Sequence, residues 1–558
     1  MNELDPWPEI DRDAVAAESD QTIPELFARV CAAYAESSAI VTPTTRLTYD
    51  GLRRRVVQAT NALSSRGVRA GDRVALWLPN SPEWIVCALA ITHVGAVCVP
   101  VNTRLRAPEV AQVLSASGAS LLITTDSFMS TPFLDICAGL LGEADGSEIA
   151  LPTSRYPRLR EIIAIDGARP WTTDWSRLLS GCRDDDWHGP VAAAIGRARP
   201  DDPVAMFWTS GSTGRPKGSL ASHRVLGNIA AYAQIIRLTS DDVCLVSCPL
   251  FYVAGFYWCL LAPLSVGAAI RPLAHLTPGE IIDAIADERA TVLIGIANAH
   301  RQLVDHPDFG HRDLTALRAM YSGGGALPVG IVRRLRSVFE LDVFCTVYGL
   351  TEAGGIATMT PVSDSDELAA ASIGFPLPQF DIRVVTPGTR EDAVEGELLL
   401  RTPYLHLGYV PDDPVGQSDW FATGDLVRRE SSGRLYFRGR TKDVVKVAGE
   451  NVSPLEVESV LLSHPSIKDA CVAGVPDPIR GEVVAAAVVA DPNAAGGVAI
   501  GPDDVLSYCK SRLAPFKRPR TVVVLDQLPN LPTGKPARTE IRELLSQAHD
   551  ARLRQDAT

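Results

Sequence analysis

Short, almost uninterrupted apolar runs recur through the first half of the chain. Residues 73–78 and 96–101 are two such runs, and each predicts a β-strand. Between them, Ser81 followed by Pro82 predicts the capped start of a helix that ends near His93. This order is a βαβ unit. Strands that are apolar on both faces are typical of a parallel sheet covered by helices on both sides.

Residues 121–124 and 162–165 are apolar runs of the same kind and predict further strands of this sheet. The segment between them, residues 126–158, contains Gly, Ser and Pro and has a helical middle. The sequence assigns this segment no role.

Residues 243–270 contain no charged residue, and a stretch of this length could span a bilayer. The stretch is interrupted by Pro249, Pro263, Gly255 and Gly267. We therefore favour a buried strand at 243–248, a loop, a short apolar helix at about 256–264 and another strand, over a membrane span.

A compact module follows a predicted hairpin strand at residues 433–438. It should contain strands near 443–447, 469–475, 483–490 and 520–525, and helices at 454–464 and 503–513. We place the boundary near residues 439–443, which predicts a domain of residues 1–440 and a second of residues 441–558.

Bulk composition restricts the class of protein. A chain of 558 residues is too long for one core, and 46% hydrophobic with 21% charged residues is typical of a globular protein. The net charge of −13 argues against a broad nucleic-acid surface, although a local basic patch could bind a phosphorylated cofactor. The eleven cysteines form no C-x-x-C pair, and the acidic N-terminus is no signal peptide, so we expect a cytoplasmic protein without zinc or disulfides.

The strongest chemical signal is residues 209–218, TSGSTGRPKG, directly after the apolar run 204–208. Glycines let backbone N–H groups approach phosphate oxygens, hydroxyls add hydrogen-bond donors, and Lys217 supplies charge. The loop is not a Walker loop, because Arg215 and Pro216 separate Gly214 from Lys217. A flexible hairpin turn is the less favoured alternative.

Further strings follow at plausible spacing: residues 322–327 (SGGGAL), 348–352 (YGLTE), 423–425 (TGD), 439–443 (GRTKD) and 532–535 (PTGK). With residues 47–49 and 71–73, they cover nearly the whole chain. Together they resemble the adenylate-forming superfamily of acyl-CoA synthetases, peptide-synthetase adenylation domains and firefly luciferases. The resemblance implies an α/β fold. A large multi-layer N-terminal domain has parallel sheets flanked by helices, and a small mobile α+β C-terminal domain follows it.

The resemblance also implies a reaction in two steps. A carboxylate attacks the α-phosphate of ATP to give an acyl-adenylate and pyrophosphate, and a thiol, usually that of CoA, then attacks the adenylate carbonyl. Both steps develop charge that preorganised cations or dipoles must stabilise. The residues expected to bind ATP or AMP are Thr209, Ser210, Gly211, Ser212, Thr213, Gly214, Lys217, Gly324, Gly325, Ala326, Tyr348, Gly349, Asp425 and Arg440.

Four residues are expected to be catalytic: Lys535, Glu352, Thr351 and Lys446. Lys535 would supply the cation in the first step, with a solvated surface lysine as the alternative. Glu352, beside Thr351 and with Thr213, would hold Mg²⁺, which takes few protein ligands. The alternative for Glu352 is a favourable charge in the first turn of a helix.

The C-terminal module is expected to meet CoA. Gly449, Glu450 and Arg480 are the predicted CoA-binding residues, and Lys442 marks the hinge. The basic residues Lys510, Arg512, Lys517, Arg518 and Arg520 could meet CoA phosphates or could form a solvated face. For the string 423–425 alone, a turn with an Asx hydrogen bond is at least as good an interpretation as a ribose site.

The chain departs from many relatives at two positions. Tyr252 follows Phe251 where many acyl- and aryl-CoA ligases have His, and Gly325 stands where many have Ala. The Phe-Asp string with which peptide synthetases bind an ammonium group is absent, which disfavours amino acids. The expected acyl pocket comprises Phe251, Tyr252, Gly323, Gly325 and Gly354.

We therefore predict an ATP-dependent acyl-CoA synthetase for an apolar carboxylic acid, with Mg²⁺ and CoA, no nucleic-acid partner and no membrane span. A homodimer is left open. The alternatives are an acyl-adenylating enzyme that loads a carrier protein, an enzyme of one half-reaction, and a nucleotide-binding protein without catalysis. The joint presence of Lys217, Glu352, Asp425, Arg440 and Lys535 argues against the last.

Overall fold

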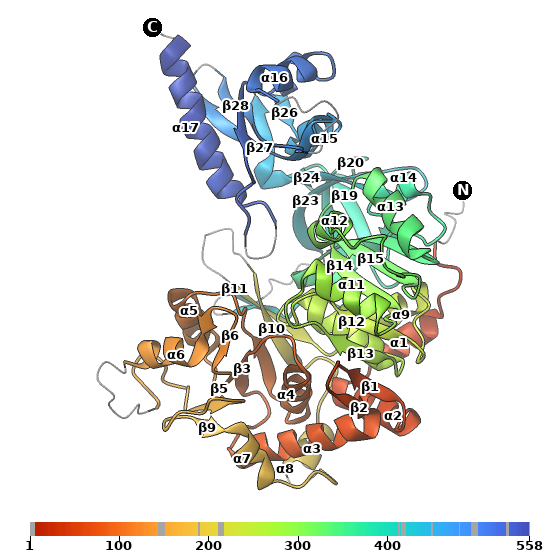
Figure 1. Ribbon diagram of the computed structural model, residues 1–558, viewed down its shortest axis with the longest axis vertical. Helices are drawn as coiled ribbons and strands as arrows, with labels where there is room; N and C mark the ends of the chain where they lie inside the picture. The colour runs from red at the N-terminus through yellow and green to blue at the C-terminus, as the bar shows by residue number, and fades with distance from the viewer. Residues whose placement is uncertain are drawn as a thin grey trace. The chain divides into compact units, whose positions relative to one another are not determined.

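The computed structural model describes residues 6–142, 151–187, 190–209, 217–410, 413–414, 420–447, 450–478, 480–492, 500–531 and 535–556 (Figure 1). The chain divides into two compact units. The first contains residues 1–381 and 401–421, and the second contains residues 382–400 and 422–558. Four strands that precede residue 441 thus group with the C-terminal segment: β19 (Asp381–Val385), β20 (Glu395–Arg401), β23 (Phe421–Arg429) and β24 (Leu435–Arg440). The boundary near residues 439–443 and the hinge at Lys442 stay predictions.

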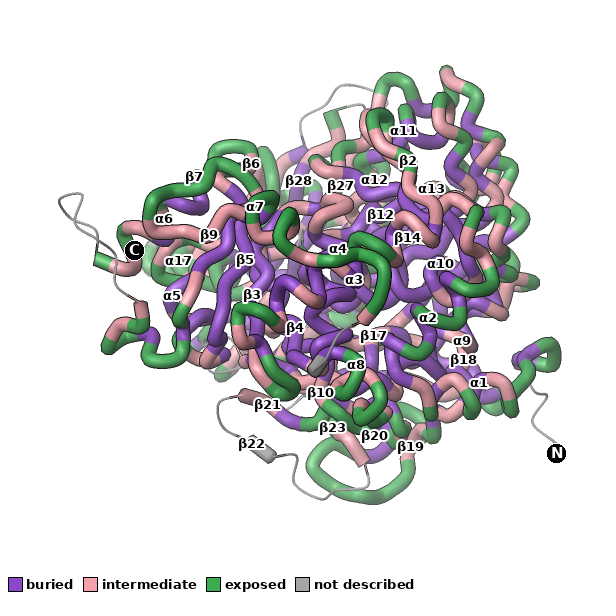
Figure 2. Tube along the Cα trace, turned by 90° about the horizontal axis from the view of Figure 1, so that it is seen from below, coloured by how far each residue is buried: buried purple, intermediate pink, exposed green. Residues whose placement is uncertain are grey.

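One nine-stranded sheet of the first unit contains the predicted βαβ strands. Strands β10, β4, β3, β5, β8 and β9 run parallel. Strands β11, β21 and β22 extend the sheet beyond β10, and each is antiparallel to the strand before it in the sheet. In spatial order the strands are β22 (Asp413–Pro414), β21 (Gly408–Val410), β11 (Lys217–Ser222), β10 (Pro203–Thr209), β4 (Val97–Pro100), β3 (Arg73–Trp77), β5 (Leu121–Thr124), β8 (Glu161–Ala164) and β9 (Thr173–Asp174). The apolar runs at 73–78, 96–101, 121–124 and 162–165 are confirmed as strands, and their buried residues appear in purple in Figure 2.

The second nine-stranded sheet carries the later motifs. Strands β16, β15, β14, β12, β13 and β1 are parallel, and β2, β17 and β18 are antiparallel to their neighbours. Their order is β18 (Phe375–Pro376), β17 (Gly355–Met359), β16 (Val343–Leu350), β15 (Ala319–Gly323), β14 (Val292–Ile296), β12 (Val243–Val246), β13 (Ala269–Pro272), β1 (Ser38–Val41) and β2 (Arg46–Thr48). The hairpin β6 (Ser127–Phe128) and β7 (Thr131–Pro132) stands apart from both sheets.

Helices flank these sheets, and α4 begins at the residue that the sequence predicts. The hydroxyl of Ser81 accepts a hydrogen bond from Trp84 N, as predicted for the start of α4. The helices of the first unit are α1 (Arg12–Ser19), α2 (Ile23–Ala33), α3 (Tyr49–Ser65), α4 (Pro82–His93), α5 (Ala107–Ser117), α6 (Phe133–Leu141), α7 (Trp175–Ser180), α8 (Pro190–Ile195), α9 (Val225–Ile235), α10 (Ala262–Ser265), α11 (Pro278–Ala286), α12 (Ala297–Val304), α13 (Val329–Phe339), η2 (Thr351–Ala353) and α14 (Asp366–Ala371). Helix α6 is the predicted helical middle of segment 126–158.

The uncharged stretch 243–270 folds as strand, helix and strand. The helix is not an ordinary α-helix: residues Ala254–Leu261 form a π-helix, η1, that leads into α10. A Cβ at Gly255 would lie 2.1 Å from Pro249 O, so only glycine allows this turn to close against the preceding loop. Among the described residues, no helix is both long enough and apolar enough to cross a membrane.

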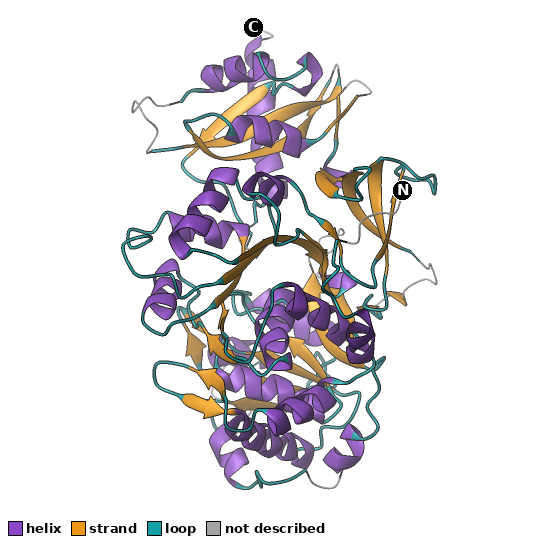
Figure 3. Cartoon of the chain, turned by 90° about the vertical axis from the view of Figure 1, so that its right-hand side faces the viewer, coloured by secondary structure: helices purple, strands orange, loops and turns teal. Residues whose placement is uncertain are grey.

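The second unit contains two sheets. The four-stranded sheet is ordered β19 (Asp381–Val385), β20 (Glu395–Arg401), β23 (Phe421–Arg429) and β24 (Leu435–Arg440). The five-stranded sheet contains β26 (Glu450–Val452), β25 (Val445–Val447), β28 (Gly481–Ala490), β27 (Ile467–Asp477) and, paired with β28, β29 (Thr521–Leu525). The helices of this unit are η3 (Thr441–Asp443), α15 (Pro454–Leu462), α16 (Pro502–Lys510), η4 (Pro515–Lys517) and α17 (Arg538–Asp556). Figure 3 shows helices in purple beside strands in orange.

The central strand β28 shows why this sheet is covered on both faces. Val484, Ala486 and Val488 lie in the core with α15 and α16, whereas the alternate residues of β28 lie in the core with Ile541 and Leu545 of α17. Successive residues of a strand point to opposite faces, so a wholly apolar strand requires two covers. The strands and helices predicted for this part of the chain are present, but the sequence analysis did not find β26 or α17.

Candidate active site

The phosphate-loop motif joins two antiparallel strands of the first unit. Thr209 ends β10 and Lys217 begins β11, and the two residues are direct partners in the ladder. The predicted residues Ser210, Gly211, Ser212, Thr213 and Gly214 lie outside the described residues. The Lys217 ammonium lies 5.2 Å from the ring centroid of Tyr409, which is within range of a cation–π contact.

Tyr409 connects this hairpin to Glu352. Strand β21 pairs with β11, so that Ser219 lies opposite Tyr409. The Tyr409 hydroxyl donates a 2.8 Å hydrogen bond to Glu352 Oε1. The predicted phosphate-loop strand and the predicted metal-binding carboxylate therefore meet through an aromatic residue that the sequence analysis missed.

His406 completes this arrangement. Its backbone N donates a 2.8 Å bond to Glu352 O, and its ring Nδ1 lies 3.0 Å from Ser219 Oγ. Burial lowers the pKa of His406, and the charge of Glu352 opposes that effect. The imidazole is therefore neutral near pH 7, and it positions the chain around Glu352 rather than supplying a charge.

Four parallel strands of the other sheet end at the same edge. The segments that follow β12, β14, β15 and β16 are residues 247–252, 297–301, 324–326 and 351–352. Ligands of open parallel sheets bind outside the carboxyl ends of the strands. This edge contains the predicted adenine and acyl residues Gly323, Gly324, Gly325, Ala326, Tyr348 and Gly349, and the predicted catalytic residue Thr351.

Contacts along this edge hold the loops together. Ser322 Oγ lies 3.0 Å from His300 Nδ1, and an Arg301 N–H donates a 3.1 Å bond to Ala326 O. A Cβ at Gly325 would lie 3.6 Å from Ala297 Cβ, an ordinary contact. Gly325 therefore leaves a space of about one methyl group beside Ala297. This is the space that the alanine side chain of many relatives would fill.

Glycines also bring residues 349–355, the predicted catalytic segment, against neighbouring parts of the chain. A Cβ at Gly349 would lie 1.6 Å from Gly355 O, and a Cβ at Gly355 would lie 2.8 Å from the indole nitrogen of Trp258. Gly354, at φ 72°, approaches Tyr404 in the same way. These close approaches fix η2, which carries Thr351 and Glu352.

Tyr252 and Phe251 lie in the loop before η1, with their ring centroids 4.7 Å apart. The Nδ2 group of Asn102 donates a 3.0 Å hydrogen bond to the Tyr252 hydroxyl. Burial raises the pKa of Tyr252 to about 12, against the opposing charge of Arg104. Where many relatives carry a titratable His, this chain thus holds a neutral, oriented phenol.

In the second unit, Asp425 and Arg440 face each other across β23 and β24. Arg440 Nε lies 3.0 Å from Asp425 Oδ1, and Asp425 is buried. The Thr423 hydroxyl accepts a 3.0 Å bond from Asp425 N. The threonine side chain makes this local turn, whereas the sequence suggested an Asx hydrogen bond. The turn and the ion pair coexist, because they use different atoms of Asp425.

Lys535 belongs to the same unit and keeps an exposed surface. Desolvation by the surrounding protein lowers the pKa of its ammonium, the charge of Arg440 lowers it further, and Asp425 raises it. Lys535 is thus in the electrostatic field of the other two predicted nucleotide-binding residues of this unit.

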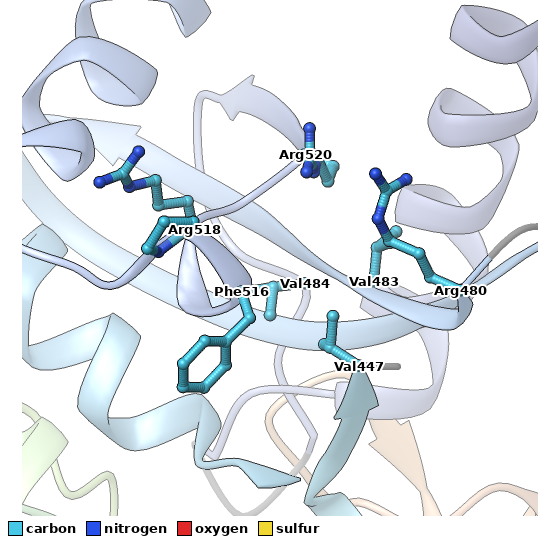
Figure 4. A pocket seen from close by; sticks show the side chains of 8 residues that line it. Val447, Arg480, Val483, Val484, Phe516, Arg518 and Arg520 are labelled. Carbon is cyan, nitrogen blue, oxygen red and sulfur yellow. The ribbon is translucent and has the colours of Figure 1, made fainter. Parts of the chain in front are cut away.

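Three of the basic residues of the C-terminal module line one pocket of about 210 Å³: Arg480, Arg518 and Arg520. Figure 4 shows them above Phe516, Val447 and Val484. By contrast, Lys517 Nζ pairs with Glu456 at 2.7 Å, and the Arg512 guanidinium lies 3.7 Å from the ring centroid of Tyr508. The basic residues therefore do not act as one patch.

The remaining predicted residues are only partly described. Gly449 lies outside the described residues, and of Glu450 only the backbone in β26 is described. Lys446 is exposed on β25, and its backbone N donates a 3.0 Å bond to Glu482. Lys442 lies in η3. Among the described residues, no group of three His, Cys, Asp or Glu side chains forms a metal cluster.

Comparison with known proteins decides the family. The model of the AMP-binding enzyme family matches residues 27–410, and that of the AMP-binding enzyme C-terminal domain matches residues 456–535. The chain belongs to the AMP-binding enzyme family. The predicted membership in the adenylate-forming superfamily is confirmed.

Similar proteins place the chain in the acyl-CoA synthetase branch. It is 35% identical over 538 residues, covering 94% of this chain and 99% of that protein, to 3-[(3aS,4S,7aS)-7a-methyl-1,5-dioxo-octahydro-1H-inden-4-yl]propanoyl:CoA ligase of Rhodococcus jostii (strain RHA1). Feruloyl-CoA synthase of Amycolatopsis sp is 31% identical, over 89% of this chain and 94% of that protein. ATP-bound MatB from Rhodopseudomonas palustris matches with a TM-score of 0.80 and 26% identity, over 94% and 99% of the two chains.

These findings confirm the predicted α/β fold and the predicted class of enzyme. The chain is an acid–thiol ligase that forms an acyl-CoA from ATP, CoA and a small carboxylic acid. The roles given to individual residues stay predictions.

Proposed function

We propose that this acid–thiol ligase activates a bulky, largely apolar carboxylic acid. The observation that carries the proposal is the aromatic wall behind the catalytic segment: Phe256, Tyr257 and Trp258 of η1 are fully buried and meet Phe207 and Tyr232 in edge-to-face contacts. Aromatic walls with few polar groups suit bulky apolar ligands. The Rhodococcus relative is named for a propanoyl group on a fused ring, which supports an acid of that size.

In the first step a carboxylate oxygen attacks the α-phosphorus of ATP, and pyrophosphate leaves as the bridging P–O bond breaks. Lys217 and the loop 209–214 would hold phosphate oxygens, and Asp425 with Arg440 would hold the ribose. Lys535 would neutralise charge on the α-phosphate, a type of stabilisation that is often worth about a hundredfold in rate.

We assign Mg²⁺ to Glu352 and Thr213, beside Thr351. The Glu352 carboxylate accepts a hydrogen bond at Oε1 from Tyr409, and carboxylate oxygens suit a hard cation. Bound there, the ion would supply a Lewis acid for phosphate oxygens. Gly324, Gly325, Ala326, Tyr348 and Gly349 would form the adenine site.

In the second step a thiol attacks the adenylate carbonyl and AMP leaves. The arginine pocket supports CoA over a carrier protein as the thiol donor, because Arg480, Arg518 and Arg520 suit the diphosphate and 3′-phosphate of CoA, whereas the phosphopantetheine arm of a carrier protein has a single phosphodiester. Gly449, Glu450 and Lys446 would border the path of the thiol.

A panel of acids tests the substrate class. Acetate, octanoate, cyclohexanepropanoate and a decalin propanoate are each supplied with ATP, Mg²⁺ and CoA, and pyrophosphate and acyl-CoA are measured separately. We expect the ring-bearing acids to have the largest kcat/KM. A preference for acetate would contradict the proposal, and pyrophosphate without acyl-CoA would indicate a different acceptor.

Two variants test the acceptor. Arg480→Ala and Arg520→Ala should each raise the KM for CoA about tenfold while pyrophosphate release changes little, as expected for loss of one charged hydrogen bond. Lys517→Ala is the matched control, because Lys517 is equally basic but paired with Glu456. An equal effect of all three variants would contradict a specific phosphate pocket.

The proposed setting is the cytoplasm. All eleven cysteines are free thiols, and ten of them are buried, as is common in a reducing compartment.

A further inference from the structure

Four buried tyrosine hydroxyls of the first unit, those of Tyr156, Tyr232, Tyr257 and Tyr321, have no hydrogen-bond partner among the described residues, and the rings of Tyr232 and Tyr321 are in contact. Tyr232 lies on α9 and is fully buried, and Tyr321 lies on β15 and is 4% exposed. Their rings meet edge to face with centroids 5.2 Å apart. A buried hydroxyl without a partner costs about 1–3 kcal/mol, and proteins satisfy nearly all such groups. Two of them in contact therefore require an explanation.

The pair lies next to the catalytic segment. Tyr321 directly precedes Ser322 and the glycine loop 323–325. Tyr232 contacts Trp258 at 4.9 Å between centroids, and Trp258 in turn abuts Gly355, three residues after Glu352.

Helix α9 is fixed against the same segment. One turn before Tyr232, the side-chain amide of Asn228 donates to Gly354 O at 3.2 Å and to Ile356 O at 2.8 Å. The rings are thus held on a rigid element, and rigid elements position binding groups more accurately than loops do.

The surroundings restrict what could satisfy these hydroxyls. Burial raises the pKa of both phenols far above the usual range, so each remains a neutral O–H donor. The titratable groups that act on Tyr232 are the thiols of Cys244, Cys248, Cys259 and Cys345, not cations or carboxylates. A ligand carboxylate would be desolvated there without a counter-charge, whereas an uncharged oxygen would gain hydrogen bonds at little cost.

We propose that the Tyr232 and Tyr321 hydroxyls recognise an uncharged oxygen, a ketone or a hydroxyl, on the part of the substrate remote from its reacting carboxyl group. The substrate class thereby narrows from a bulky apolar acid to a ring-bearing acid with a polar oxygen on the ring. This inference rests on the proposed function, because it assumes that the acyl group reaches the aromatic wall.

The missing hydrogen bonds of the two hydroxyls determine how strongly the site should discriminate between a ring with an oxygen and a plain ring. A plain hydrocarbon ring would occupy the same space but leave two buried donors without an acceptor. Sites built to bond a substrate oxygen reject the analogue that lacks it far more strongly than apolar pockets reject a change of one methylene. Discrimination of at least about tenfold between matched acids is therefore expected.

Matched pairs of acids test the inference on the full-length enzyme. The probes are cyclohexanepropanoate and decalin propanoate, each compared with its ring ketones, and kcat/KM is measured by pyrophosphate release. We expect at least one ketone to exceed its parent acid by about tenfold or more. If no ring acid is activated while short acids are, the proposed function fails. If ring acids are activated without any preference for the ketone, only the present inference fails.

Variants assign the effect to residues. Tyr232→Phe and Tyr321→Phe should lower kcat/KM for the preferred ketone by about tenfold and leave the parent acid within about threefold. Tyr156→Phe is the matched control. Its hydroxyl is also buried and without a partner among the described residues, but it lies in the core with Cys137 and Leu159, remote from the acyl residues in the fold. If the variants lose kcat/KM equally for the ketone and its parent acid, or lose none, the two hydroxyls do not recognise the substrate oxygen and bond an internal water instead.

Discussion

The Tyr409 hydroxyl lies 2.8 Å from Oε1 of Glu352, while the Tyr409 ring lies 5.2 Å from the ammonium of Lys217. One aromatic side chain thus touches both the predicted metal ligand and the lysine of the phosphate loop. Groups that orient a metal-binding carboxylate commonly change metal affinity by about ten- to a hundredfold when removed. Tyr409 is therefore a positioning residue for Glu352.

Tyr409→Phe should raise the Mg²⁺ concentration needed for half-maximal adenylation by about tenfold, since the carboxylate loses its oriented partner. The measurement is pyrophosphate release over a Mg²⁺ titration. In a Glu352→Gln background the same change should add little, because the two residues act as one unit. Additive effects in the double variant would contradict the coupling.

Lys535→Ala should lower adenylation by at least about a hundredfold, as loss of one preorganised cation often does. Thioester formation from a supplied acyl-adenylate should change much less, because the α-phosphate is then the leaving group and no longer the electrophile. Stopped-flow measurement of each half-reaction separates the two. Equal losses in both would remove the role assigned to Lys535.

The pH profile gives an independent test of the same residue. Desolvation and Arg440 lower the pKa of Lys535 below its usual value, which is about 10.4. Only the protonated lysine supplies the charge, so adenylation should decline as pH rises through this lowered pKa, earlier than for an ordinary lysine. Lys535→Arg, which keeps its proton, should move that decline to higher pH. An unchanged alkaline limb in Lys535→Arg would assign the limb to another group.

The sequence predicts the parts of this protein that depend on short segments. Apolar runs identify β3, β4, β5 and β8 because these strands are buried on both faces. The catalytic strings are also local, since a loop that binds phosphate must carry its glycines, hydroxyls and lysine together. The strands predicted from apolar runs are present in the fold, and the family indicated by the short motifs is confirmed.

Contacts between distant segments are what the sequence does not reveal. Glu352 and Tyr409 are separated by 57 residues, and Ser219 and His406 by 187. No motif around residues 404–410 indicates that strand β21 will pair with β11. Helix α17 was missed for another reason: of its apolar residues only Ile541 and Leu545 are buried in the core, which is too narrow a stripe to stand out among its charges.

Gly325→Leu tests the dimensions of the acyl pocket. A Cβ at this position fits at 3.6 Å from Ala297, so Gly325→Ala should be tolerated, whereas a leucine side chain must occupy space beyond that contact. Activity on decalin propanoate should fall by about tenfold or more, and activity on butyrate should change little. Each methylene that a substrate can no longer bury costs roughly 0.8 kcal/mol, or about fourfold in kcat/KM. An unchanged ratio of the two activities would place Gly325 outside the pocket.

A buried network in the second unit links its last helix to the arginine pocket. His549 Nδ1 of α17 lies 2.8 Å from Thr521 Oγ1, and its Nε2 lies 3.4 Å from Asp477 Oδ2. Asp477 Oδ1 in turn accepts a 2.8 Å bond from Arg480 N, and Thr521 directly follows Arg520. The imidazole thus supports both segments that carry pocket arginines.

His549→Leu should lower the free energy of unfolding by about 1–3 kcal/mol, because it removes the hydrogen bonds of the buried imidazole with Thr521 and Asp477. It should also raise the KM for CoA while leaving pyrophosphate release nearly unchanged, since Arg480 loses the support of its turn. Urea denaturation of the full chain measures the first effect, and steady-state kinetics of both half-reactions measures the second. His549→Gln, which can both donate and accept a hydrogen bond, should restore part of the CoA affinity. A loss of stability with an unchanged KM for CoA would show that the network holds α17 alone and does not position Arg480.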